Sequence, residues 1–113
     1  MITSYKIDGE TFKQVKDFPN YFVSDRGRVY NQETKRYIGS SDRYGNVRVG
    51  LYNNDKTLNI AIHELVMKYY GKPKPYPWFK IHHINGQNDD NDIFNLEWID
   101  KKRYIFKKFF QEN

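Results

Sequence analysis

Two adjacent histidines at the start of a polar loop constrain this chain more than any other feature of its sequence. A short, mostly apolar segment, residues 79–81, leads into His82 and His83, and a loop rich in Asn and Asp that contains Gly86 follows. Apolar and polar residues alternate again over residues 96–99. This order predicts a strand, a functional loop and a second strand.

The paired imidazoles suit the hydrolysis of a phosphodiester bond. That reaction requires a base that takes a proton from water, and neutral imidazole has the ordinary pKa that matches this task near neutral pH. It also requires positive charge at the scissile phosphate, which a divalent metal ion supplies. Neighbouring residues of a strand point to opposite faces, so one histidine could bind the metal while the other faces water. The alternative is that both are ordinary polar surface residues, since such groups are not specific to active sites.

The complete pattern is more specific than the two histidines. It reads His-His-Ile-x-Gly-x-x-x-x-Asn-x-x-x-Asn-Leu-x-Trp from His82 onward, and it resembles the HNH nucleases, in particular the homing endonucleases of phages and introns. The resemblance implies a ββα unit that holds one metal ion. It implies that His83 is the general base, that Asn95 holds the base's ring in place and that His82 lies at the metal, with Asn91 in an accessory role.

Two positions depart from the family pattern at the expected metal site. The residue before the base is often a metal-binding Asp in the family, whereas this chain has His82, and imidazole suits magnesium less well than carboxylate does. The second ligand is usually an Asn or His in the first turn of the last helix. Counting from Asn95 places Tyr104 there, and a neutral phenol is a poor ligand. We therefore expect a weak magnesium or manganese site, or none if the protein is catalytically degenerate.

Composition favours a nucleic-acid partner. The chain has 113 residues, which is one domain's worth, and its net charge is +5 with 18% aromatic residues. Basic groups displace counterions from phosphates while aromatic rings stack, although the same composition fits a basic protein whose rings fill its core. The absence of cysteine excludes disulfides and thiolate zinc sites. With no long apolar run and no export signal, we expect no membrane association and a cytoplasmic location. The resemblance implies a bacterial host and a gene carried by a phage or mobile element.

The N-terminal half predicts a turn at Pro19-Asn20 and then two hairpins. Residues 21–24 and 28–30 flank a turn at Asp25-Arg26-Gly27, and this unit resembles the nuclease-associated module that precedes HNH domains, where it is linked to DNA contact. Arg26 and Arg28 are therefore candidate DNA contacts, unless they are solvated arginines of an ordinary hairpin. Residues 45–52 and 58–62 alternate as a second hairpin, with Arg48 on its polar face as a further candidate.

A helix is expected after the second hairpin. Residues 63–70 have apolar residues at helical spacing and Gly71 follows as a C-terminal cap, so His63 is expected to be structural. Residues 72–77 hold three of the four prolines and form a stiff connector. Asp100 is placed to cap a last helix over residues 101–112, whose basic face carries further candidate DNA contacts: Lys101, Lys102, Lys107 and Lys108.

The sequence predicts an α+β protein: small β-hairpins followed by an HNH-type ββα-metal unit, in one compact domain. Residues 1–71 would form the hairpin module and helix, and residues 72–113 the HNH-like unit. We favour a metal-dependent DNA endonuclease. The alternative is a catalytically degenerate HNH-fold protein that binds DNA or inhibits a host enzyme, with a protein partner in that case. Tyr104 favours the second function, whereas His83, Asn91 and Asn95 favour the first.

Overall fold

The N-terminal third of the chain forms a five-stranded antiparallel meander. The computed structural model describes residues 4–101 of the chain. Its first sheet has the strand order β1-β2-β3-β4-β5, with consecutive strands paired. The strands are β1 (Ser4–Ile7), β2 (Glu10–Val15), β3 (Phe18–Ser24), β4 (Val29–Asn31) and β5 (Arg36–Ile38). One face of this sheet supplies core residues such as Val23 and Val29, and the other carries an aromatic group that includes Phe12, Phe22 and Tyr37.

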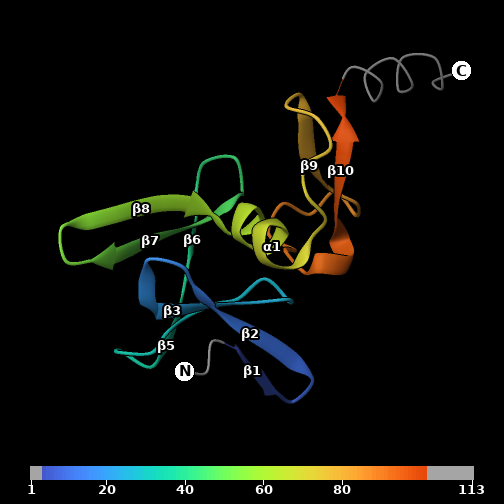
Figure 1. Ribbon diagram of the computed structural model, residues 1–113. Helices are drawn as coiled ribbons and strands as arrows, with labels where there is room; N and C mark the ends of the chain where they lie inside the picture. The colour runs from blue at the N-terminus through green and yellow to red at the C-terminus, as the bar shows by residue number, and fades with distance from the viewer. Residues whose placement is uncertain (1–3, 102–113) are drawn as a thin grey trace, which may run out of the picture.

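Two smaller sheets follow, separated by a helix. The first of them has the order β6-β7-β8, formed by β6 (Ser40–Ser41), β7 (Val47–Asn53) and β8 (Lys56–Ala61). Helix α1 (Ile62–Tyr70) begins at the residue after β8. The last sheet is a hairpin of β9 (Phe79–His83) and β10 (Leu96–Asp100), and the loop between these strands contains the short 3₁₀ helix η1 (Ile93–Asn95). Figure 1 shows α1 at the centre, between the β7–β8 hairpin and the β9–β10 hairpin.

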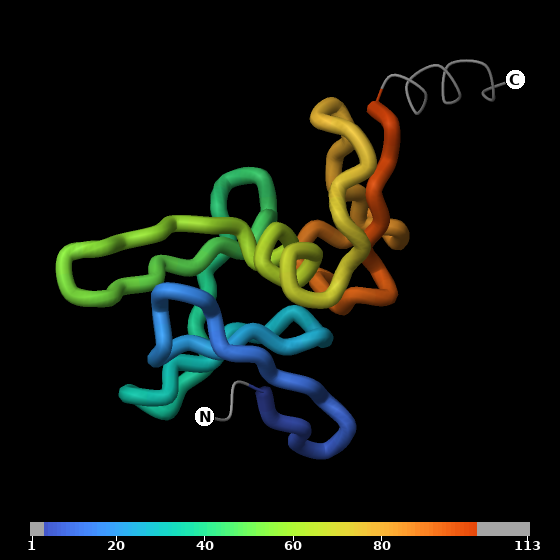
Figure 2. The backbone as a smooth tube through the Cα atoms, in the orientation of Figure 1, coloured from blue at the N-terminus to red at the C-terminus, as the bar shows by residue number. Residues whose placement is uncertain are grey.

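The core lies where α1 meets the sheets. Leu65 and Val66 of α1 are fully buried with Val23 of β3 and Leu51 of β7, and Leu96 brings the β9–β10 hairpin into the same cluster. Burying a side chain of this size contributes about 1.5–3 kcal/mol. Helix α1 therefore joins the N-terminal sheets to the hairpin that carries His82 and His83. Residues 71–78, named here the connector, leave α1 and run alongside that hairpin (Figure 2).

The α+β class predicted from the sequence is confirmed, as are the two N-terminal hairpins and the helix before the connector. One detail of the prediction is wrong. Pro19 and Asn20 were expected to turn the chain, but both lie inside β3. The turn comes two residues earlier, where Asp17 has a φ of 69°, and a register shift between Gln14 and Val15 accommodates the irregular pairing. Asp tolerates this left-handed conformation better than most residues.

The predicted last helix over residues 101–112 lies outside the part of the chain that the structure describes. Lys102, Tyr104, Lys107 and Lys108 therefore have no structural account, and Lys101 is the last described residue, with an exposed side chain. Among the described residues, no helix has the length and apolar character to cross a membrane.

Candidate active site

The β9–β10 hairpin places the two histidines on opposite faces. His83 pairs with Leu96 across the hairpin, and both side chains are buried on the face toward α1. His82 pairs with Glu97 on the other face. The alternation follows from the two-residue period of a strand. The two imidazoles can therefore have separate tasks, as the sequence predicts.

Asn91 holds the ring of His83. Only 7% of His83 is exposed, and its Nε2 lies 2.7 Å from the Oδ1 of Asn91, which is itself 3% exposed. Because an amide oxygen only accepts hydrogen bonds, Nε2 must carry the proton in this contact. In a neutral ring the lone pair is then on Nδ1, for which the described residues provide no hydrogen-bond partner. The pair therefore presents a fixed imidazole with one basic nitrogen.

The turn between β3 and β4 supports Asn91 from behind. Gly27 in that turn has a φ of +84°, and a Cβ added to it would lie 2.5 Å from the carbonyl oxygen of Asn91. The backbone N–H of Ile93 also donates to the carbonyl oxygen of Asp25, at 2.8 Å. Only glycine permits this backbone conformation together with so close an approach. The N-terminal sheet is therefore in direct contact with the residue that orients His83.

The prediction that Asn95 holds the ring of His83 is wrong. The Nδ2 of Asn95 donates to the side chain of Asn85 at 2.9 Å and to the carbonyl oxygen of Asp90 at 2.8 Å, while its Oδ1 accepts from the backbone N–H of Asn85. These bonds close the base of the loop that follows His83. Asn95 thus fixes the shape of the loop, and the ring contact belongs to Asn91 because that residue is the one directed at His83.

His82 has a carboxylate neighbour. Its Nδ1 lies 2.9 Å from the Oε2 of Glu97, its partner across the hairpin. Within residues 4–101, no group of three or more His, Asp or Glu side chains is arranged as metal ligands. The described residues thus offer one imidazole and one carboxylate as neighbouring donors. This number suits magnesium, which keeps several waters and is commonly held by one or two carboxylates together with substrate phosphates.

His63, at the start of α1, packs against the candidate base. Its ring meets that of His83 edge to face, with centroids 5.1 Å apart and planes at 86°. Burial is the main cause that lowers the pKa of His63 to about 4; the nearby charges of His83 and Arg48 add to this effect, and Asp42 opposes it. The Nδ1 of His63 is buried and has no hydrogen-bond partner among the described residues. His63 is therefore neutral at pH 7 and adds no positive charge beside His83.

Comparison with known proteins agrees with this geometry. No family model matches the chain. Two proteins of Acanthamoeba polyphaga mimivirus, each named as an uncharacterized HNH endonuclease, are similar in sequence. The first is 33% identical over 93 residues, which are 81% of this chain and 23% of that protein. The second is 34% identical over 86 residues, which are 74% of this chain and 26% of the relative. Over most of its length, the chain is thus similar to proteins named as HNH endonucleases.

A solved structure shows the same fold. The HNH homing endonuclease I-HmuI superposes with a TM-score of 0.75 at 24% sequence identity, over 88% of this chain and 58% of that protein. The chain thus spans about a quarter of the viral HNH relatives and little more than half of the solved HNH structure. Because the superposition covers 88% of the chain, the shared fold extends well beyond the β9–β10 hairpin, which is named here the HNH hairpin.

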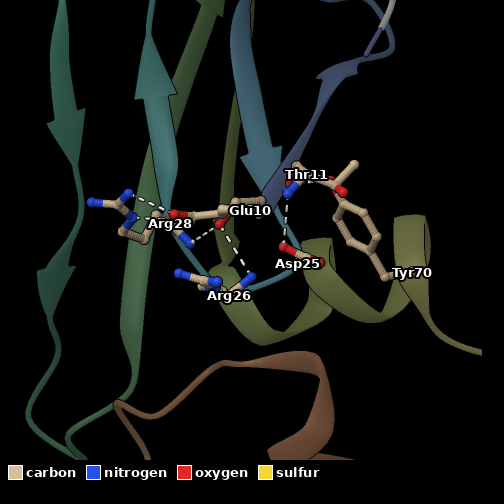
Figure 3. Close-up of polar contacts among 7 residues, drawn as sticks. Glu10, Thr11, Asp25, Arg26, Arg28 and Tyr70 are labelled. Atoms are coloured by element: carbon tan, nitrogen blue, oxygen red, sulfur yellow. Dashed lines mark hydrogen bonds and ion pairs between the residues drawn. The ribbon is translucent and has the colours of Figure 1, made fainter. Parts of the chain in front are cut away.

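The arginines predicted to bind DNA differ in how they are engaged. Arg28 forms two hydrogen bonds to the carboxylate of Glu10, at 2.6 and 3.0 Å (Figure 3). Its guanidinium lies 4.1 Å from the ring centre of Tyr37. The hydrogen bonds to Glu10 raise the pKa of Arg28, and they lower that of Glu10 in turn. Arg48 donates from Nε to the Oδ1 of Asn59, at 2.8 Å. Arg26 is exposed. Of the three, Arg28 thus has a clear structural function within the first sheet.

Sequence reasoning missed two contacts of the HNH site. Glu97 was not singled out, although its pairing with His82 follows from the register of a hairpin whose loop closes between His83 and Leu96. The contact between His63 and His83 was also missed. It joins residues 20 positions apart, and nothing in the local pattern of α1 indicates which turn of the helix faces the hairpin.

Proposed function

We propose that the chain is the catalytic part of a DNA endonuclease that hydrolyses phosphodiester bonds, with His83 as the general base. The observation that carries this proposal is the contact between His83 and Asn91, which fixes the ring and leaves Nδ1 as the nitrogen that can accept a proton. A fixed imidazole with a free basic nitrogen is what activation of an attacking water requires. The similarity to proteins named as HNH endonucleases supports the same reaction.

The neighbours of His83 suit the charge that it acquires. When Nδ1 takes a proton from water, the ring becomes positive, and the amide oxygen of Asn91 stabilises it through Nε2–H. His63 stays neutral because its pKa is about 4, so it does not repel the imidazolium. The ring of His63 also limits the orientations of His83 by edge-to-face contact. The protein thus supplies orientation on two sides and leaves one side of the ring for the water.

A divalent ion, magnesium or manganese, would be held by His82 and Glu97. These two donors fit such an ion when water and phosphate oxygens complete its shell. When bound, the ion would stabilise negative charge on the phosphate and on the leaving oxygen. With two protein donors, we expect the ion to bind weakly in the absence of DNA. The cytoplasm of a bacterial host stays a prediction from the sequence, and the two relatives are viral.

Plasmid nicking in magnesium or manganese tests the proposal. We expect wild-type protein to nick supercoiled DNA and His83→Ala to be inactive while its DNA affinity stays within about twofold, because the change removes a proton acceptor and no phosphate-binding charge. Gln87→Ala, in the same exposed loop, is the matched control and should keep full activity. Nicking by His83→Ala at the wild-type rate would remove His83 from the mechanism. DNA binding without any nicking by wild type would favour the degenerate alternative.

A further inference from the structure

A groove borders the HNH hairpin on the side of α1. It has a volume of about 650 Å³ and lies between α1, the connector and strand β9. Aromatic and apolar groups, among them Phe79, Ile81 and Trp98, line part of it. Among the described residues, the predicted DNA contacts Arg26, Arg28, Arg48 and Lys101 do not line it, so it is a separate surface from the arginine turns.

Lysines dominate the charge of this groove. Its lining contains four of them, Lys68, Lys72, Lys74 and Lys80, and one acid, Glu64. All four lysines are exposed, and within residues 4–101 none of them forms an ion pair. Like charges gathered without acidic partners repel one another, so the arrangement is stabilised by an anion. A chain of phosphates fits a groove with lysines along it better than a single small anion does.

The connector is held over the groove by Trp98. The indole N–H of Trp98 donates to the carbonyl oxygen of Lys72 at 2.8 Å, and the ammonium of Lys74 lies 5.9 Å from the centre of the same ring. These contacts fix two of the four lysines to strand β10. Further along the connector, the rings of Tyr76 and Trp78 stack 4.8 Å apart and are 55% and 45% exposed. A half-exposed aromatic stack beside lysines is a surface on which a base can stack.

One end of the groove reaches the candidate base. His63 is part of its lining, and the ring of His63 contacts His83. Strand β9 spans about 13 Å from Phe79 to His83, at about 3.3 Å per residue. This length corresponds to about four base-pair steps measured along the axis of B-DNA, at about 3.4 Å per step. A DNA strand whose scissile bond lies at His83 would therefore continue into the lysine-lined groove, which is long enough for several phosphates.

We propose that this lysine groove binds the phosphate backbone of the DNA strand that flanks the cleaved bond. The lysines neutralise successive phosphates, and the Tyr76–Trp78 stack receives a base at the outer end. The inference rests on the proposed function, because it assigns the path of the same substrate. It adds a binding site made of α1, the connector and β9, distinct from the arginines of the first two sheets.

Salt-dependent DNA binding tests the groove. Affinity for a short duplex is measured in EDTA, so that no cleavage occurs, for the triple variant Lys68→Ala/Lys74→Ala/Lys80→Ala. The matched control is Lys6→Ala/Lys16→Ala/Lys56→Ala, which removes the same charge from exposed positions outside the groove. We expect the groove variant to flatten the slope of log K against log salt by about 2.7, at roughly 0.9 for each phosphate that is no longer neutralised. If the two triple variants change the slope of log K against log salt equally, the groove is not a specific DNA-binding site and the proposal is refuted.

A second variant separates geometry from charge. Trp98→Phe removes the hydrogen bond to Lys72 and keeps an aromatic ring beneath Lys74, so we expect affinity to fall roughly two- to tenfold with little change in slope. Tyr52→Phe, a change to an exposed ring outside the groove, is the control. Wild-type nicking is measured in parallel. If DNA binding depends on the groove lysines but wild type does not nick DNA, the proposed endonuclease function is refuted and the proposed DNA-binding groove is supported. If wild type nicks DNA and the groove variants bind it as their controls do, the groove is refuted and the endonuclease function is supported. If wild type binds no DNA at low salt, both proposals are refuted.

Discussion

Two polar pairs in this molecule are each built around a buried side chain, and they have opposite outcomes. In the first sheet, Glu10 is 3% exposed and its carboxylate receives two hydrogen bonds from Arg28. In the HNH hairpin, His83 is 7% exposed and receives support from Asn91 at one nitrogen only. The turn that contains Gly27 lies between the two pairs, with Arg28 on its one side and Asn91 packed against its backbone.

The difference lies in which protonation state the partner favours. A guanidinium stabilises the carboxylate of Glu10 and lowers its pKa, so this group is a weak base at neutral pH. The neutral amide of Asn91 orients His83 and leaves its second nitrogen open. The charged partner of Glu10 gives that carboxylate a structural role. The neutral partner of His83 engages one of its two nitrogens, so the other can take part in catalysis. Changes near Glu10 should therefore cost stability, and changes near His83 should cost rate.

The largest effect is expected where the two regions meet. Gly27→Ala forces a Cβ to within 2.5 Å of the carbonyl oxygen of Asn91, at a φ of +84° that alanine adopts poorly. We expect the free energy of unfolding to fall by about 3 kcal/mol, from overpacking and backbone strain together. Nicking should also slow in the fraction that remains folded, because Asn91 moves. Denaturant melts and single-turnover rates measure the two effects. If Gly27→Ala has the nicking rate and stability of wild type, Gly27 and Asn91 are not tightly packed against each other.

Asn91→Ala should separate orientation from folding. We expect the nicking rate to fall by about 100-fold, because the ring of His83 loses its orienting acceptor and general-base catalysis contributes about that much. Asn88→Ala is the matched control, since Asn88 lies in the same loop and its side chain donates to the backbone carbonyl of Tyr44. Single-turnover nicking is the measurement, with circular dichroism as a check of folding. If both variants retain the wild-type rate, Asn91 does not orient the base.

Glu10→Gln should do the opposite. Removal of the carboxylate leaves the Arg28 guanidinium without its charged acceptor, and we expect a loss of about 2 kcal/mol of stability with an unchanged nicking rate. The control is Glu33→Gln, because Glu33 is exposed and its carboxylate accepts a hydrogen bond from Asn20. Thermal or denaturant unfolding gives the measurement. A large loss of DNA affinity at unchanged stability would return Arg28 to the DNA contacts predicted from the sequence.

The smallest effect concerns acid stability. The folded state holds the pKa of His63 at about 4 against an ordinary 6.5, so the unfolded chain binds more protons between these values and stability falls as pH drops through 6.5 toward 4. The expected cost at pH 5.5 is about 1 kcal/mol relative to pH 7.5. His63→Phe should remove this part of the acid limb in denaturant melts recorded at the two pH values. The charged and titratable groups that act on His63 are His83, Arg48 and Asp42. If His63→Phe loses as much stability as wild type between pH 7.5 and 5.5, groups other than His63 cause the loss.

Elements with clean alternation could be predicted from the sequence, and others could not. The β7–β8 hairpin shows apolar Val47, Val49 and Leu51 at every second position, so its strands were evident. Strands β1 and β2 were missed because both faces of β2 are at least partly covered, one by the aromatic group and one by the core, and no single face stands out. Pro19 was misplaced because proline in a strand is uncommon.

The site was predictable in its chemistry and not in its contacts. His83 follows from the pattern of the polar loop, but Asn91 and Asn95 are the same residue type in the same loop. Which of them reaches the ring depends on how the loop closes, and that closure is made by Asn85 and the carbonyl of Asp90. Likewise, Arg28 looked like a DNA contact because its acceptor, Glu10, is 18 residues away and reaches it only when the first sheet has formed.

The close approach of Gly27 to Asn91 has a consequence for protein engineering. A chimera that fused residues 72–113 to a different DNA-targeting carrier would remove the wall behind Asn91 together with the Asp25 carbonyl that holds Ile93. A graft that retains the cutting efficiency of the parent must therefore import the β3–β4 turn with its glycine, or supply a substitute backbone at the same spot. The natural boundary for transplantation lies upstream of Ser24, well before the connector.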